Sequence, residues 1–192
     1  MSIATFLNSG RRLFSWLILL VATLSCLFLF GTPSALAGIN DDNYDGNIFV
    51  LYGGNGSLVP PKVKLAESLK RDNPTLLVYY ADDSKDCKQY AIVVSQLQAF
   101  YGRAADFIPV SVDSIPTKSN YAPTEVGYYY KGFVPQVVLF DKSGKQVINE
   151  KGQVPFEKID DAFRELFNLV PRTESKELKP RAFNEFSSEL AQ

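Results

Sequence analysis

The chain has 192 residues, of which 46% are hydrophobic and 21% charged, so it is long enough for one globular domain with a buried core and shorter appendages. A formal net charge of -1 argues against a nucleic-acid-binding protein, which needs a strongly basic surface. The chain contains no histidine, which excludes Ser-His and Cys-His nucleophile pairs and most zinc and haem sites, and we expect no cofactor and no metal.

The first 37 residues have the order of an export signal. Arg11 and Arg12 precede an uncharged apolar run at residues 13–30, and Ala35-Leu36-Ala37 places small residues ahead of Gly38. A basic start, an apolar core and such a site are typical of a signal peptide that is cut before Gly38. The apolar run is also long enough to stay in a bilayer as an anchor. Residues 1–37 are therefore predicted to be a signal peptide or a membrane anchor.

The next segments lead into a folded domain. Residues 38–46 are rich in Asp and Asn and predict a linker. The short apolar run at residues 47–52 predicts a buried strand. The glycines at 53–56 do not have the spacing of a nucleotide-binding loop and predict a plain turn. Pro60 and Pro61 favour the start of a helix over residues 62–71.

The middle of the chain alternates strands with helices. Residues 75–81 form a β-prone apolar run, which predicts a central strand covered on both faces. Asp82, Asp83 and Ser84 supply turn and N-cap chemistry for a long helix over residues 85–103. The periodicity predicts that this helix buries the following side chains: Cys87, Ile92, Val93, Leu97 and Phe100 or Tyr101.

The remaining elements complete an α/β domain over residues 47–170. Strands are predicted at 107–112, 136–140 and 145–149, the last two joined by a hairpin turn at 141–144. A short helix is expected near 124–130 and a final helix at 155–169. This order predicts a central mixed β-sheet flanked by helices. Residues 171–192 are a polar C-terminal tail, either frayed or ordered by a partner through Phe183, Phe186 and Leu190.

One stretch of the predicted domain resembles the thioredoxin family. The strand at residues 76–81 leads through a short loop to Ser84-Lys85-Asp86-Cys87-Lys88, where the family has Cys-x-x-Cys-Lys at a helix start. Further on, Val134-Pro135 precedes a strand and a hairpin, as the family's cis-proline does. The resemblance covers residues 47–170 and implies a thioredoxin-like fold. It also implies a groove between the motif loop and Pro135 that binds extended polypeptide.

The departures from the family pattern concern its chemistry. Ser84 stands where the family has its nucleophilic cysteine, Val78 where it has a buried acid, and Asp83 where it has a tryptophan. Cys87 keeps the second cysteine position, which points inward in the family. A serine without a histidine is a poor nucleophile, and a buried thiol reacts slowly.

The sequence therefore predicts a binding protein whose dithiol motif is degenerate, and enzyme activity stays open. The binding residues expected from the resemblance are Ser84, Lys85, Asp86, Tyr130, Val134 and Pro135. The alternative is a monothiol disulfide oxidoreductase that acts through Cys87. Tyr128, Tyr129 and Tyr130 cannot all point inward, so at least one of them is expected on the surface.

A looser resemblance concerns exported thioredoxin-like proteins of cyanobacteria and chloroplasts. It implies a location in the thylakoid lumen or periplasm and an accessory role in the assembly or stability of a photosynthetic membrane complex. The expected partner is a protein, and residues 13–30 would contact the membrane if the signal stays uncleaved.

Overall fold

The computed structural model describes residues 14–26 and 38–175, which belong to two separate compact units, 1–37 and 38–192. Residues 14–26 form an exposed helix. Within the described ranges, no helix has both the length and the apolar character needed to cross a bilayer. The predicted cleavage site at Ala35–Ala37 and the tail residues Phe183, Phe186 and Leu190 lie outside the described residues.

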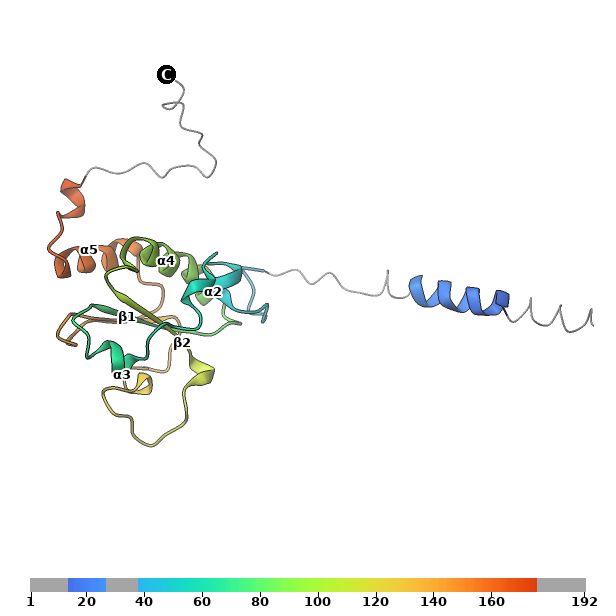
Figure 1. Ribbon diagram of the computed structural model, residues 1–192, viewed down its shortest axis with the longest axis horizontal. Coiled ribbons are helices and arrows are strands. Elements are labelled where there is room, and N and C mark those ends of the chain that lie inside the picture. The colour runs from blue at the N-terminus through green and yellow to red at the C-terminus, as the bar shows by residue number, and fades with distance from the viewer. Residues whose placement is uncertain (1–13, 27–37, 176–192) are drawn as a thin grey trace, which may run out of the picture. The chain divides into compact units, whose positions relative to one another are not determined.

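The second unit is built on a four-stranded mixed sheet (Figure 1). Its strands are β1 (Thr75–Tyr80), β2 (Asp106–Ser111), β3 (Gln136–Phe140) and β4 (Gln146–Lys151), in the order β2-β1-β3-β4. β1 pairs parallel with β2 and antiparallel with β3, which pairs antiparallel with β4. Every side chain of β1 and β3 is buried, as expected for central strands covered on both faces. These four predicted strands and the mixed sheet are confirmed.

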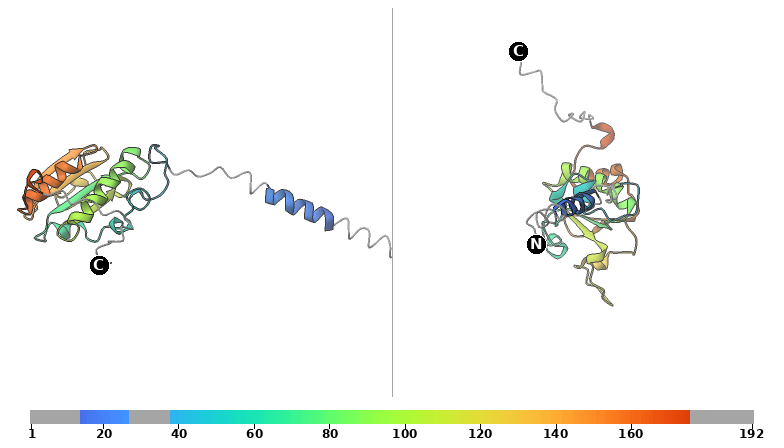
Figure 2. Two further views of the ribbon diagram at one scale, coloured as in Figure 1. Left: turned by 90° about the horizontal axis from the view of Figure 1, so that it is seen from above. Right: turned by 90° about the vertical axis from the view of Figure 1, so that its right-hand side faces the viewer.

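Helices cover one face of the sheet. α4 (Lys85–Tyr101) and α5 (Phe156–Leu166) lie against each other on that face, together with the short α2 (Ile48–Leu51) (Figures 1 and 2). They pack on alternate strand residues, as the two-residue period of a strand requires: Leu76, Val78, Tyr80, Val137, Leu139 and Ile148. The larger of two hydrophobic cores therefore lies between this face and the helices.

The opposite face is covered mainly by irregular chain. It carries the smaller core, which includes Leu77, Tyr79, Val138 and Phe140, under α3 (Leu65–Ser68) and the long connection of residues 112–134. That connection contains two 3₁₀ turns, η2 (Val112–Ser114) and η3 (Val126–Tyr128), the second of which replaces the helix expected near 124–130. Tyrosine hydroxyls fix it: Tyr79 donates to Val126 O, and Tyr129 donates to Pro123 O at 2.8 Å.

The strand predicted at residues 47–52 is wrong, because this segment forms α2. The Asn47 side chain accepts hydrogen bonds from Phe49 N and Val50 N, and Asp82 Oδ1 accepts one from Ile48 N at 3.0 Å. These caps satisfy the first helical amides, and a four-residue apolar run does not distinguish strand from helix by pattern alone. The segment still buries Ile48 and Phe49, so its role in the core was predicted correctly.

The neighbouring edge of the sheet also disfavours a further strand. Asp106 N donates to Pro74 O, so the alternate residues Phe107 and Pro109 direct their backbone groups away from β1. Pro109 has no N–H to offer on that side, which is why a proline can occupy the middle of β2. The chain around η1 (Gly56–Leu58) packs beside β2 without forming a strand there.

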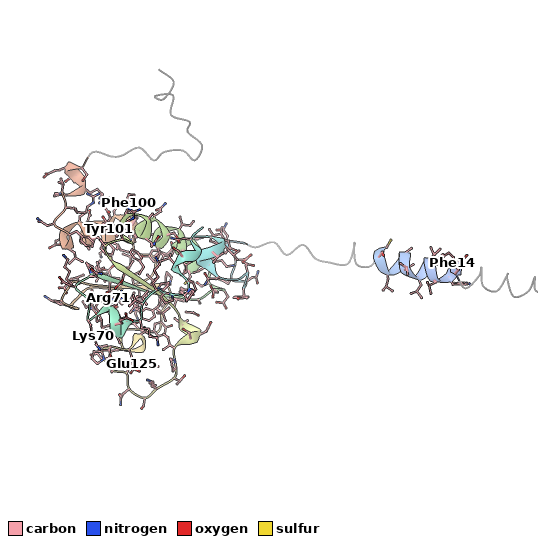
Figure 3. The ribbon with its side chains drawn as sticks, in the orientation of Figure 1. Phe14, Lys70, Arg71, Phe100, Tyr101 and Glu125 are labelled. Carbon is pink, nitrogen blue, oxygen red and sulfur yellow. The ribbon has the colours of Figure 1, made fainter. Side chains whose placement is uncertain are left out.

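Two helix predictions need correction. The helix expected at 62–71 is reduced to α3. Val63 contributes to the second core from a bend that precedes α3, and the amides of Lys70 and Arg71 form turn bonds to the carbonyls of Glu67 and Ser68. In α4, Ile92 is exposed at 40%, contrary to the prediction. Of the alternatives Phe100 and Tyr101, which Figure 3 labels, Tyr101 is the buried one, and Cys87 and Leu97 are buried as predicted. The buried face starts at Cys87 and follows helical spacing, so Ile92 falls on the solvent side; it comprises Cys87, Lys88, Tyr90, Ala91, Val94, Leu97 and Tyr101.

The carboxyl-terminal part of the domain follows the expectation closely. The helix predicted at 155–169 is α5, in which Ile159 and Phe163 are fully buried. It is followed by exposed Leu169 and Val170 and by η4 (Arg172–Glu174). The hairpin turn at 141–144 is confirmed, with Asp141 Oδ1 accepting from Ser143 N and Lys145 N.

Candidate functional site

The amino end of α4 begins at Ser84. The Ser84 side chain caps the helix and accepts a hydrogen bond from Cys87 N at 3.4 Å, while its carbonyl accepts from Lys88 N at 2.9 Å. Serine is a preferred N-cap because its oxygen satisfies an amide that has no partner within the helix. The residue that stands in the nucleophile position therefore has a structural role in starting the helix. Lys85 and Asp86 follow it as exposed residues of the first turn.

Cys87 is buried in the larger core, with 1% of its surface exposed, and its thiol is free. Burial raises the pKa of Cys87, and the nearby carboxylates of Asp86 and Asp83 raise it further. A thiol that is buried and protonated is a poor nucleophile at neutral pH. The structure thus agrees with the inward position expected for this cysteine.

The other expected site residues meet near the end of β1. Val134 packs against both cores, and the Val134–Pro135 peptide is cis, as predicted. The Tyr130 ring centre lies 5.2 Å from that of Tyr79. Burial raises the pKa of Tyr130, as do the nearby Asp113 and Cys87. Tyr130, Val134 and Cys87 are therefore brought together, and Phe133, exposed at 51%, precedes them as an apolar surface residue.

The three adjacent tyrosines are distributed as predicted. Tyr128 is exposed, whereas Tyr129 and Tyr130 are half-buried. The Tyr129 carbonyl accepts from the buried Gln136 side chain at 2.7 Å, and the other end of that amide accepts from Lys131 N. Gln136 thereby fixes the chain that leads to Pro135.

Carboxylates surround this end of the sheet. Burial raises the pKa of Asp82, although Ile48 N donates to its carboxylate, and the negative charges of Asp113 and Asp83 raise it further. Asp82, Asp83 and Asp113 are close enough to affect one another, so the surface beside Cys87 carries several negative charges. An acidic surface disfavours a thiolate there, which again argues against thiol chemistry.

Sequence reasoning missed the most extensive polar contact of α4. Residues 38–46, predicted as a linker and named here the N-terminal strap, lie against the amino end of the helix. Lys88 is fully buried, and its Nζ donates to Gly38 O at 3.0 Å, Asp41 Oδ1 at 2.9 Å and Asp45 Oδ2 at 2.6 Å. Asp42 Oδ1 accepts from Lys85 N at 2.8 Å.

The electrostatics of the strap are those of a mutually stabilised ion cluster. Burial lowers the pKa of Lys88, but the hydrogen bonds that Lys88 donates to Asp45 and Asp41 outweigh this effect, so the pKa of Lys88 is raised. Hydrogen bonding to Lys88 lowers the pKa of Asp41 and of Asp45. A lysine on the buried face of a predicted helix, with an acid-rich segment upstream, was the sequence signal that could have revealed this contact.

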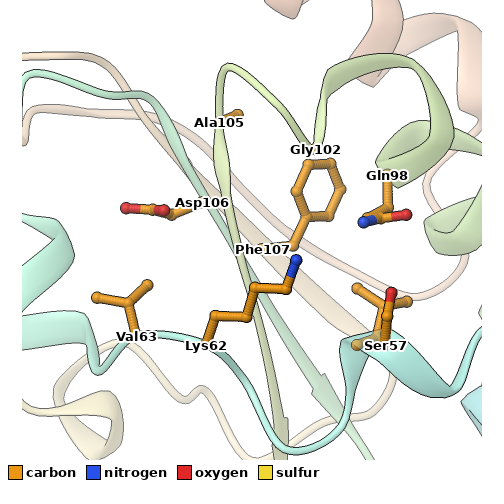
Figure 4. A pocket seen from close by; sticks show the side chains of 9 residues that line it. Ser57, Lys62, Val63, Gln98, Gly102, Ala105, Asp106 and Phe107 are labelled. Atoms are coloured by element: carbon orange, nitrogen blue, oxygen red, sulfur yellow. The ribbon is translucent and has the colours of Figure 1, made fainter.

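A small cavity lies at the opposite end of α4 (Figure 4). Its volume is about 40 Å³, and Lys62, Gln98, Asp106 and Phe107 are among its lining residues. A cavity of this size has room for one or two water molecules but not for a large side chain of a bound peptide. The candidate binding site therefore stays with the residues around Ser84 and Pro135.

The described residues, 14–26 and 38–175, contain no group of three or more His, Cys, Asp or Glu side chains arranged to hold a metal ion. The second cysteine, Cys26, is exposed on the helix of residues 14–26, in the other unit. The chemistry available around Cys87 is therefore hydrogen bonding, apolar contact and charge, with a single protected thiol.

Comparisons with known proteins relate this chain to thioredoxin-like proteins. The family profile of the thioredoxin-like domain matches residues 61–167. A thylakoid membrane protein of Synechocystis is 60% identical over 157 residues, which cover 82% of this chain and 78% of that protein. A homologue of the thiol:disulfide interchange protein TxlA, also from Synechocystis, is 26% identical over 98 residues, covering 51% of this chain and 52% of the relative.

Solved structures match less closely. The germline-specific thioredoxin Deadhead of Drosophila shares 21% identity with a TM-score of 0.40, and the match covers 50% of this chain and 82% of that chain.

Proposed function

Because the chain belongs to the thioredoxin-like family, we propose that it uses the family's fold to bind a protein partner and does not exchange disulfides. The observation that carries the proposal is the pair Ser84 and Cys87. The first is a helix cap with no thiol, and the second is a thiol with 1% exposure and a raised pKa. A disulfide exchange cycle needs an accessible thiolate, and this pair does not supply one.

The binding surface we propose runs from Ser84, Lys85 and Asp86 to Tyr130, Val134 and Pro135. The cis-proline turn is rigid because Pro135 O accepts from Gly152 N at 2.7 Å and Gln136 holds the preceding loop. Exposed Phe133 and half-buried Tyr130 supply apolar contact area beside it. Aromatic side chains on a rigid frame suit the recognition of an extended segment of another protein.

An insulin-reduction assay with dithiothreitol tests the proposal. We expect the wild-type chain to give the rate of dithiothreitol alone, and Ser84→Cys to raise it, because the variant restores a dithiol in the family's geometry. Ser84→Cys combined with Cys87→Ser is the matched control and should lose the gain. A wild-type rate close to that of an ordinary thioredoxin would contradict the proposal.

A second candidate is thiol chemistry at Cys87 alone, which the similarity to the TxlA homologue favours. It requires Cys87 to react in the folded protein. Alkylation of the native chain in a Cys26→Ser background distinguishes the two: labelling as fast as that of an exposed thiol supports this candidate. Labelling only after denaturation rejects it.

We further propose that the protein is exported to the thylakoid lumen or periplasm and assists the assembly or stability of a membrane complex. The relative of 60% identity supports this because its name places that protein in the thylakoid membrane. Residues 13–30 would tether the chain to the membrane if they are retained, and residues 171–192 would dock to the complex.

Affinity capture from native membranes, with the full chain and with a chain that ends at residue 170, tests this role. A membrane-complex subunit captured by the full chain and lost on truncation is the expected result. Recovery of the same set of proteins with an unrelated exported domain would overturn it.

A further inference from the structure

The N-terminal strap begins at Gly38, which is surrounded by charged groups. Its carbonyl accepts from Lys88 Nζ at 3.0 Å, and its backbone amide contributes to lowering the pKa of Asp45, after the larger contributions from Lys88 and Tyr52. Asp41 N also donates to Gly38 O, at 3.4 Å. The Gly38 carbonyl is therefore hydrogen-bonded to the cluster, and its amide lies on the side of Asp45.

A larger residue at this position would displace the Asp41 side chain. A Cβ on residue 38 would lie 2.0 Å from Asp41 Oδ2 and 2.8 Å from Asp41 Cγ. Asp41 would have to move, and it is held by its 2.9 Å hydrogen bond to Lys88 Nζ. The carboxylate of Asp41 thus lies against the Cα of Gly38.

The negative charges of this cluster outnumber its positive charge by one. Asp41 and Asp45 carry two negative charges, and Lys88, which is fully buried, supplies one positive charge to both. Tyr52 donates its hydroxyl to Asp45 at 2.6 Å and adds no charge. A second cation at the nitrogen of Gly38 would balance the cluster, because a partly buried carboxylate is stabilised by an ionic hydrogen bond.

We propose that the chain is cut between Ala37 and Gly38 and that the new α-ammonium group of Gly38 binds Asp45 and Asp41. Hydrolysis of this amide consumes one water, leaves a carboxylate on Ala37 and frees the amine of Gly38, which takes up a proton. The co-reactant is a signal peptidase, for which Ala35-Leu36-Ala37 is a suitable recognition sequence. The strap is then the seat of the mature amino terminus, and the proposal is independent of the proposed binding function.

The folded unit after the cut is complete in itself. Both hydrophobic cores lie within residues 48–167, and the unit of residues 38–192 is compact without residues 1–37. A chain that begins at Gly38 therefore contains everything that holds the strap.

The first experiment measures the amino terminus directly. The full chain is produced in a host with an export pathway, and the mass of the recovered protein is determined. A mature chain that begins at Gly38 is expected; retention of Met1, or a first residue other than Gly38, overturns the proposal.

The second experiment tests the seat. Chains that begin at Gly38 and at Ala37 are compared by thermal unfolding at pH 7. The α-amino group has an ordinary pKa of about 7.7–8.0, and Asp41 and Asp45 raise it in the folded state. We expect a Tm advantage of about 2–4 °C for the Gly38 chain, as for one partly exposed ion pair in a domain of this size.

The Tm advantage of the Gly38 chain should depend on pH, and the direction of the pKa shift fixes how. A pKa raised by folding contributes stability that is complete below the unfolded value and is lost as pH rises through the folded one. The other groups that face the amine are Asp41, Asp45, Lys88 and Tyr52, and the last two have raised pKa values. The advantage should therefore shrink toward pH 10. Equal Tm values for the two chains at pH 7 overturn the proposed seat.

A substitution supplies a matched control. Gly38→Ala keeps a small residue after the cut but forces Asp41 away from Lys88, whereas Gly56→Ala adds a Cβ in ordinary contact, 3.6 Å from Val50. In the Gly38 chain we expect Gly38→Ala to lower Tm more than Gly56→Ala does. Equal effects of the two substitutions would contradict the seat.

Discussion

At its carboxyl end α4 is held by aromatic packing, and at its amino end it is held by charge. Tyr101 stacks on Phe163 with ring centres 4.5 Å apart, and its hydroxyl donates to Asp160 at 2.5 Å. Lys88, by contrast, reaches out of the helical layer to the N-terminal strap. Both contacts bury a polar group, but only the second depends on a segment whose sequence looks like a linker.

The difference separates an end that is held within the helical layer from an end that is held by the N-terminal strap. Asp160 at the carboxyl end is 4% exposed and also accepts from Arg164 Nε at 2.7 Å, within α5 itself. The strap at the amino end has no helix or strand and is joined to the domain through Lys85, Lys88 and Gln89. The candidate binding residues Ser84, Lys85 and Asp86 lie at the end held by the strap.

The largest effect is expected from Phe163→Ala at the carboxyl end. Phe163 is fully buried and stacks with Tyr101 and Phe167, so its removal leaves a cavity and should cost about 3–5 kcal/mol of unfolding free energy. Urea unfolding followed by circular dichroism measures it. Phe100→Ala, at a position exposed at 71%, is the control and should cost much less. Similar losses for both would show that the aromatic packing does not hold this end.

The second effect is expected from Lys88→Met at the amino end. Methionine fills a similar volume but leaves Asp41 and Asp45 facing each other without a cation, so Tm should fall and the strap should detach. Hydrogen exchange of the Lys85 amide, which donates to Asp42, reports the detachment and should become faster. Lys85→Met, an exposed neighbour, should leave both readouts near wild type. Unchanged protection in Lys88→Met would rule out the charge-based attachment.

A smaller effect is expected from Tyr101→Phe, which keeps the ring and removes the hydroxyl. Asp160 then loses one hydrogen bond in a buried position, which should cost about 1–2 kcal/mol. Chemical denaturation measures it, with Tyr128→Phe on the surface as the matched control. A loss as large as that of Phe163→Ala would mean that the hydrogen bond, and not the packing, dominates this end.

The smallest effect is expected when the pH is lowered and the carboxylates of the strap take up protons. Hydrogen bonds to Lys88 lower the pKa of Asp41 and Asp45 below their ordinary value of 3.8. A lowered folded pKa gives stability that is present above the unfolded value and is lost as pH falls through the folded one. The Tm difference between wild type and Asp41→Asn/Asp45→Asn should therefore narrow below about pH 4. A constant difference from pH 7 to pH 3 would show that these carboxylates do not hold the strap by charge.

Much of the fold could be predicted from the sequence because its central elements carry strong local patterns. The continuous apolar runs of β1 and β3 and the Asp141 turn gave strands and a hairpin at the right residues. The α2 segment could not be assigned, because its helix depends on Asp82, which is 34 residues away from the Ile48 amide it binds. Long-range caps of this kind leave no periodic signal in the chain.

In the candidate site, too, some features could be predicted from the sequence and others depend on long-range contacts. The cis-proline and the buried Cys87 followed from the family resemblance, and both are found in the structure. The contacts of Lys88 did not follow, because a lysine in a helix is ordinarily exposed and its partners lie more than 40 residues away. The predicted roles of Ser84, Lys85, Asp86 and Tyr130 in binding stay predictions.

Pro109, in the middle of β2, has a consequence for how copies of this protein behave together. A second molecule that tried to extend the sheet along β2 would find a gap in the row of donors and a ring in the way. Fibril growth by strand recruitment is thus disfavoured along this border, whereas β4 forms the other border of the sheet among the described residues. The same proline that fits the outer side of β2 thus also protects that side against pairing with a second copy.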